Sequence, residues 1–205
     1  MKLLADPAAL IRDHRRSLTV IAAGYLALFL AGILVTVIVP QLRPEGLGGL
    51  ASGQGATGLG QVITDSYRSG NIALAAVVTL AVNLISASLV QTTVPTLIVP
   101  FLGVVITLIR GLSWGVLFSP VGAEDGTFLI HYVTLLIEGA AYVLVGFSAW
   151  VQGRMFLQPA RYGFASRRAG YLGGLVATLR IYVWVIALLV VGAIYEAFTV
   201  ILFIA

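Results

Sequence analysis

Residues 135–153, LLIEGAAYVLVGFSAWVQG, form an almost wholly apolar stretch that holds a single carboxylate, Glu138. Gly139 and Gly146 belong to a series of small residues along it, which would let neighbouring helices approach closely. A free carboxylate in hydrocarbon costs roughly 2.5–3.5 kcal/mol on insertion scales. Glu138 therefore needs a partner, a proton or water, and we expect the other helices to supply it.

The composition of the whole chain is that of a membrane protein. Of its 205 residues, 60% are hydrophobic and only 10% are charged, whereas soluble domains carry about 25% charged residues. The chain has no cysteine, which excludes disulfides and thiolate metal sites. Its net charge of +4 does not indicate a nucleic-acid partner, because the arginines gather at the ends of apolar segments. We predict an all-α, polytopic transmembrane bundle.

Five apolar segments are long enough to cross a hydrocarbon core of about 30 Å. A basic leader, 1–16, precedes a single transmembrane domain, 17–205. A glycine-rich external loop and a basic cytoplasmic loop are expected at 41–69 and 154–180, and a tight turn held by Pro95 at 92–96. Within the basic loop, residues 169–179 are too few to span, so they either lie at the interface or extend the last helix inward. The predicted spans are 17–39, 71–91, 97–118, 128–151 and 181–205.

The distribution of positive charge predicts a cytoplasmic N-terminus. With that orientation, nine Lys and Arg residues lie inside, and only Arg43 and Arg68 lie outside. The reverse orientation would place the nine outside, which the positive-inside rule disfavours. Four of the inner arginines also suit contact with anionic lipid or an acidic partner: Arg154, Arg161, Arg167 and Arg168.

The candidate polar site residues inside the predicted spans are Asn83, Arg110, His131, Glu138 and Glu196. At about 1.5 Å per residue, Arg110 and Glu196 share a level in the outer half, and Glu138 lies deeper. We therefore predict that Arg110 pairs with one or both carboxylates. Two roles remain open for these groups. They either fix the register of the helices or form a path for protons or ions.

The other motifs concern helix packing, and none of them is a set of catalytic residues. Gly111 and Gly115 form a small-xxx-small pair that predicts close helix approach beside Arg110. His131 is expected to form hydrogen bonds rather than to bind a metal. Neither an HExxH nor a GxSxG motif is present. We expect no catalysis, no metal and no cofactor.

Several segments in order resemble the stage II sporulation protein M family. They are SGNIALAAVV (69–78), TLIRGLSWG (107–115), IEGAAYVLVGFSAW (137–150), RRAG (167–170) and WVIALLVVGAIYEAFTV (184–200). The resemblance implies a multi-pass protein of a bacterial or archaeal cytoplasmic membrane that acts through partner proteins. It places Glu138 and Glu196 at the two glutamate positions of the family. The protein from which this family takes its name is similar to a membrane scaffold for peptidoglycan-remodelling proteins.

The sequence is compatible with two functions for this protein. The first is an integral membrane scaffold or accessory subunit that binds other membrane proteins. The alternative is a small secondary transporter or channel that uses Glu138, Arg110 and Glu196. A continuous cavity reaching Glu138 would favour transport, and an apolar groove on a dry bundle would favour a scaffold.

Overall fold

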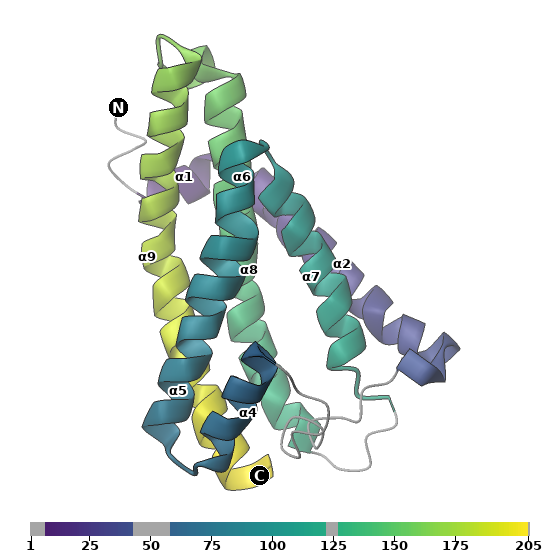
Figure 1. The fold of residues 1–205 in the computed structure, drawn as a ribbon. Helices are drawn as coiled ribbons and strands as arrows, with labels where there is room; N and C mark the ends of the chain where they lie inside the picture. The colour runs from purple at the N-terminus through teal and green to yellow at the C-terminus, as the bar shows by residue number, and fades with distance from the viewer. Residues whose placement is uncertain (1–6, 43–57, 122–126, 205) are drawn as a thin grey trace.

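The structure, a computed structural model, describes residues 7–42, 58–121 and 127–204, and all regular elements in these ranges are helical (Figure 1). Two segments, η3 and η5, have π-helical hydrogen bonding. In chain order the elements are α1 (Pro7–Asp13), α2 (Arg15–Ile38), the 3-10 turn η2 (Pro40–Leu42), α4 (Leu59–Arg68), α5 (Ile72–Ala81), η3 (Val82–Thr93), α6 (Val94–Ile98), α7 (Leu102–Leu117), α8 (Thr127–Leu157), the 3-10 turn η4 (Pro159–Tyr162), α9 (Arg167–Thr199) and η5 (Val200–Ile204).

The all-α prediction is confirmed for the described residues, and four helices among them are long and apolar enough to cross a membrane. They cover Arg15–Ile38, Ile72–Ile98, Ile130–Leu157 and Arg167–Phe203. The remaining apolar helix, α7, has 16 residues. At about 1.5 Å per residue, α7 is roughly 24 Å long, which is shorter than a typical hydrocarbon core.

The predicted turn at 92–96 is wrong, because the helix continues through Pro95 to Ile98. Pro95 stands in the first turn of α6, directly after the π-helical segment. Inside a membrane helix, proline is tolerated where local π adjustments and side-chain hydroxyls satisfy the backbone groups that it leaves free. The chain reverses instead at 99–101, where Phe101 has a left-handed backbone with φ of 69°. The third apolar segment therefore begins at Leu102 rather than at residue 97.

The basic connection expected at 154–180 is also much shorter than predicted. Helix α8 continues to Leu157 and α9 already begins at Arg167, so residues 169–179 extend the last helix inward. Ser166 caps α9 by accepting a hydrogen bond from the backbone N–H of Ala169. As a result, the α8–α9 hairpin rises above the turn between α6 and α7 at the upper end of Figure 1.

The basic leader and the glycine-rich loop both contain helix. Leu10 of α1 is only 1% exposed and belongs to the hydrophobic core, so the leader packs against the bundle. Within the expected loop 41–69, residues 59–68 form α4, whose Tyr67 is buried. Most of the glycine-rich stretch, 43–57, lies outside the described residues.

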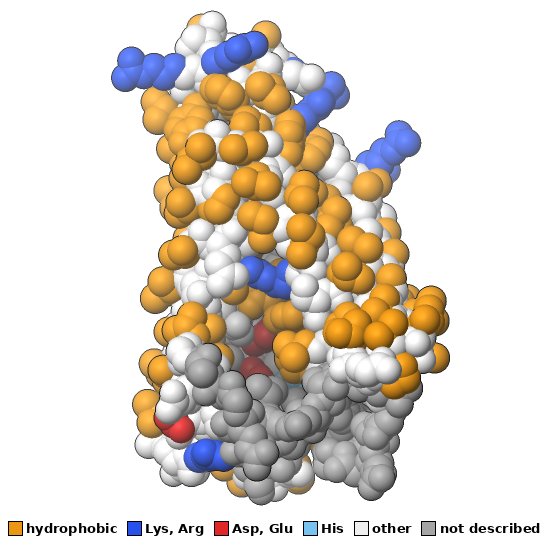
Figure 2. All heavy atoms as spheres, turned by 45° about the vertical axis from the view of Figure 1, so that its right-hand side comes forward, with side chains coloured by type: hydrophobic (Ala, Val, Ile, Leu, Met, Phe, Trp, Pro, Cys, Tyr) orange, Lys and Arg blue, Asp and Glu red, His pale blue; other side chains and the backbone are white. Residues whose placement is uncertain are grey.

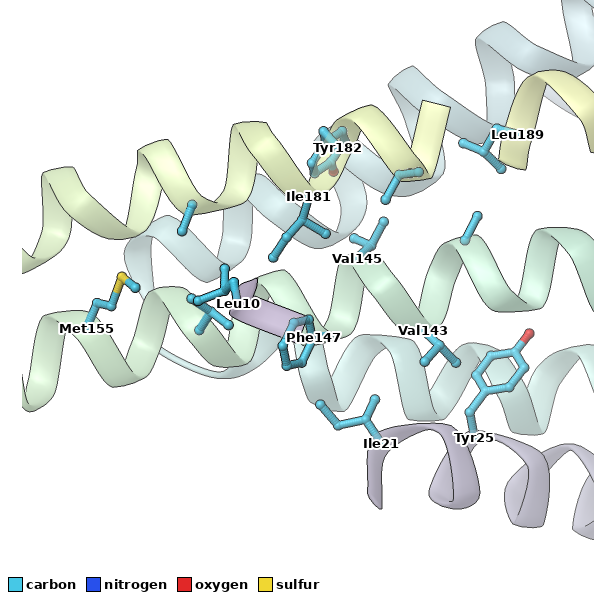
Figure 3. Close-up of a cluster of buried hydrophobic side chains, with 14 residues drawn as sticks. Leu10, Ile21, Tyr25, Val143, Val145, Phe147, Met155, Ile181, Tyr182 and Leu189 are labelled. Atoms are coloured by element: carbon cyan, nitrogen blue, oxygen red, sulfur yellow. The ribbon is translucent and has the colours of Figure 1, made fainter. Parts of the chain in front are cut away.

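Helix α8 is the central element of the bundle. In its apolar window 67% of residues are buried, against 17% for the Ile72–Ile98 helix. Figure 3 shows the apolar cluster between α8, α9 and the start of α2, with Val145 and Phe147 of α8 facing Ile181 and Ile21. The stretch around Glu138 is thus surrounded by other helices.

Glycines bring the peripheral helices close together. A Cβ at Gly111 would lie 2.8 Å from the carbonyl oxygen of Tyr25, and one at Gly115 would overlap the carbonyl of Phe29. Helices α2 and α7 therefore pack backbone to backbone, and Figure 1 shows them side by side, leaning away from α8 and α9. On α8, Gly139 faces Tyr25 and Gly146 faces Thr107 of α7.

We expect Gly115→Val to lower the thermal stability of the detergent-purified protein strongly. The new side chain cannot fit against Phe29 unless α2 and α7 separate, and overpacking typically costs about 1–3 kcal/mol. Ser113→Val, at an exposed position of the same helix, is the control and should unfold like the parent. Equal melting temperatures for the two variants would contradict the close contact.

Candidate functional site

Glu138 lies in the bundle interior with 4% of its surface exposed. Its Oε1 accepts a hydrogen bond of 2.6 Å from the side-chain nitrogen of Asn83 in η3. Gly192 lets α9 pack against the other side, because a Cβ there would lie 3.0 Å from Cγ of Glu138. Three helical segments therefore enclose this carboxylate.

The side chain of Asn83 connects Glu138 to Tyr142, which lies on the same helix as Glu138, α8. The hydroxyl of Tyr142 donates a hydrogen bond of 2.9 Å to Oδ1 of Asn83. Tyr142 follows Glu138 by four residues, so both side chains lie on one face of α8. The amide of Asn83 thus donates to the carboxylate and accepts from the phenol, which fixes its orientation.

Arg110 is not paired with either carboxylate among the described residues, contrary to the sequence-based prediction. Its guanidinium donates to the carbonyl oxygen of Ala87 at 3.0 Å and to Oε1 of Gln91 at 3.2 Å. It also lies 4.5 Å from the ring centroid of Tyr142, a cation–π distance. The physical reason is the later turn: Arg110 is eight residues after the start of α7 at Leu102, about 12 Å along the helix.

The π-helical segment η3 contributes to the position of these groups. The hydroxyls of Ser88 and Thr92 bond the carbonyls of Asn83 and Ala87, each five residues earlier. The same Ala87 carbonyl receives Arg110. Extended π segments are rare and often occur at functional sites. Residues 82–93 contain neither proline nor glycine, so the sequence does not predict η3.

Glu196 follows Gly192 by four residues on α9, so it lies on the face of α9 that packs against Glu138, and its charge acts on Glu138. Tyr67 of α4 contacts the Glu196 carboxylate and shares a hydrogen bond of 2.8 Å with the hydroxyl of Thr79 in α5. A series of polar side chains therefore crosses the bundle from α7 to α4. Its members are Arg110, Tyr142, Asn83, Glu138, Glu196, Tyr67 and Thr79.

The space-filling view shows polar groups within an apolar face. In Figure 2, acidic and basic side chains are visible at mid-height in a hollow between apolar surfaces. Sequence reasoning found Asn83, Arg110, Glu138 and Glu196, and the structure connects Asn83 to Glu138. The prediction from the sequence did not include Tyr142 or Tyr67, although the four-residue spacing from Glu138 could have indicated Tyr142.

His131 lies near the start of α8 and is 1% exposed. Its ring packs against Phe118 with centroids 5.1 Å apart. Neither ring nitrogen has a hydrogen-bond partner within the described chain. Among the residues that the structure describes, no group of three or more His, Cys, Asp or Glu residues could hold a metal ion.

A basic cluster occupies the opposite end, where α1 meets η4. The ring of His14 packs edge-on against Trp150 and Tyr162, at 5.2 and 5.7 Å between centroids. Arg154 lies 5.6 Å from the Trp150 ring. Burial lowers the pKa of His14 below its ordinary value, Asp13 opposes this shift, and Arg161 adds to it. Figure 2 shows Lys and Arg side chains gathered at this end.

Comparison of the chain with protein-family models, curated proteins and solved structures finds no match.

We expect Tyr142→Phe and Tyr142→Leu to differ in their effects on stability. The phenylalanine variant loses the hydrogen bond to Asn83, which is worth roughly 0.6–1.7 kcal/mol in a membrane helix. It keeps a ring beneath Arg110. The leucine variant also loses the cation–π contact, worth about 2 kcal/mol when desolvated. Unfolding of the purified protein measures both, and equal losses would contradict the role of the ring.

Proposed function

We propose that this chain is an integral membrane protein that acts by binding partner proteins within the membrane and has no catalytic activity of its own. In this proposal α7 is a fifth, short span, and the N-terminus and the 158–166 connection lie in the cytoplasm. The apolar character of α7 and its close packing along α2 support the fifth span. The basic end of the molecule supports the orientation, because positive residues favour the cytoplasmic side.

The observation that carries partner binding is an apolar crevice between α2 and α8, here called the α2–α8 crevice. It has a volume of about 210 Å³. Gly139 and Ala140 supply small residues on α8, and helices in membranes associate where small residues permit close approach. Its lining residues are Tyr25, Leu26, Phe29, Tyr132, Leu135, Leu136, Gly139, Ala140 and Val143.

The occupant of this crevice is, in our proposal, a transmembrane helix of another protein. Both walls belong to helices that are long and apolar enough to span a membrane, so an entering segment meets only hydrocarbon or protein. The resemblance to the stage II sporulation protein M family supports the same role in a bacterial or archaeal cytoplasmic membrane. Anionic lipids are further partners at the basic end, where Arg161, Arg167 and Arg168 are exposed.

A transporter or channel is the second candidate, and the polar series around Glu138 favours it. Buried Asp, Glu and His residues line proton and ion paths in many membrane proteins. The hollow in Figure 2 exposes acidic side chains between apolar surfaces. This candidate uses Glu138, Glu196 and Arg110, whereas partner binding uses the α2–α8 crevice, so the two can be tested separately.

Photo-crosslinking from two matched leucines tests partner binding. Leu136 lines the crevice and is 69% exposed, and Leu179 on α9 is 70% exposed. With p-benzoylphenylalanine at one position or the other, irradiated native membranes should yield a discrete protein adduct from position 136 alone. Ala140→Trp should fill the crevice and reduce that adduct. Lipid adducts alone at both positions, or the same protein adducts from both, would contradict the proposal.

A further inference from the structure

Helix α8 buries a row of polar atoms that have no hydrogen-bond partner in the described structure. Toward Thr127 they are both ring nitrogens of His131 and Oγ1 of Thr134, and toward Leu157 they are Oε1 of Gln152 and Nε of Arg154. His131 and Thr134 are 1% and 0% exposed. Ser148, further along the same helix, differs because its hydroxyl donates to the carbonyl of Val145 at 2.8 Å. Unpartnered polar atoms therefore occur toward both ends of α8, and those of His131 and Thr134 lie on the side of Glu138 nearest Thr127.

The unpartnered atoms of His131 and Thr134 lie on the side of α8 that carries Glu138. His131, Thr134 and Glu138 are separated by three and four residues, so they lie on one face of α8. Side chains of a helix lean toward its N-terminus, so the Glu138 side chain extends over the turn that carries Thr134. The free polar atoms thus lie between the Thr127 end of α8 and the buried carboxylate.

Buried polar atoms in native proteins are satisfied by protein or by bound water, because leaving them unpaired is costly. A buried water needs two to four polar partners, and His131, Thr134 and Glu138 together offer that number. Ser or Thr hydroxyls in a helix can also bond the carbonyl of a preceding turn, as Thr199 does. Thr134 makes no such bond, so its hydroxyl is free to hold water.

The charges around Glu138 favour a positive ligand. Glu196 acts on Glu138 with a like charge, and Arg110 is bonded to Ala87 and Gln91 instead. The other titratable groups that interact with the pair are Tyr142, Tyr67 and Tyr25, and His131 lies two turns nearer Thr127 on the same helix as Glu138. Within residues 7–42, 58–121 and 127–204, no cationic side chain is bonded to either carboxylate, and two interacting carboxylates in hydrocarbon favour the binding of a proton or a cation.

We propose that His131 and Thr134 line a hydrated path from the Thr127 end of α8 to a site for a small monovalent cation, hydronium included, at Glu138 and Glu196. The inference deepens the transporter alternative and is independent of the α2–α8 crevice. Water in the path forms hydrogen bonds with the unpartnered atoms of His131 and Thr134. The positive charge of the cation offsets the negative charges of the two carboxylates. The basic end, with Arg154 and Arg161, lies at the other end of α8.

The cysteine-free chain permits a direct test with Ag⁺, a monovalent cation that reacts with thiols. Thr134→Cys, Ser148→Cys and Leu136→Cys are prepared in the full chain and reconstituted in vesicles. Loss of thiol is followed by maleimide labelling after denaturation. Thr134→Cys should react roughly tenfold faster than the buried Ser148→Cys and the lipid-exposed Leu136→Cys, because a dry apolar site excludes an ion. His131→Cys, expected to react like Thr134→Cys, replaces it if that variant does not fold.

A second comparison tests the carboxylate. Glu138→Gln in the Thr134→Cys background should slow the reaction with Ag⁺ several-fold, but leave the reaction with neutral methyl methanethiosulfonate unchanged. Slowing of the Ag⁺ reaction by Na⁺ relative to choline identifies a metal cation as ligand. Slowing by acid without an effect of Na⁺ identifies the proton. Reaction of Thr134→Cys no faster than Ser148→Cys, or an Ag⁺ rate unaffected by Glu138→Gln, would overturn the proposal.

Discussion

The hydrogen bond between Asn83 and Glu138 is the interaction on which the arrangement of the bundle depends. It joins η3 to α8 at a point where the carboxylate is almost fully enclosed. An uncompensated charge there would be costly in hydrocarbon. Gly192 brings α9 against the same side chain, so the positions of η3, α8 and α9 are all coupled to one carboxylate. Tyr142 extends this coupling to Arg110 through its ring.

Two kinds of contact hold the remaining helices. Helices α2 and α7 associate through glycine-mediated backbone contacts at Gly32, Gly111 and Gly115, which need no polar partner. Around Glu138, by contrast, polar side chains determine which groups face one another. The lining of the α2–α8 crevice includes none of the seven residues of the polar series, although the two adjoin at Tyr25 and Gly139. Partner binding and cation binding can coexist in one chain because they use different residues.

The sequence predicted the helical class, the membrane composition and most polar side chains of the site, because apolar length and isolated charges are local properties. It did not predict the turn, since Pro95 is compatible with the start of α6 after a π segment. That error placed Arg110 too far along its helix and suggested a pairing with Glu196 or Glu138. The extension of α9 back to Arg167 depends on the Ser166 cap and on packing against α8, which hydropathy does not report.

A double-mutant cycle between Asn83 and Glu138 tests the central interaction most directly. The free energies of unfolding of Asn83→Ala, Glu138→Ala and the double variant are measured in one detergent. If the two side chains stabilise each other, the double variant loses less than the sum of the single losses, by about 1 kcal/mol or more. Losses that add to within about 0.5 kcal/mol would show that the two residues act independently and would contradict this account.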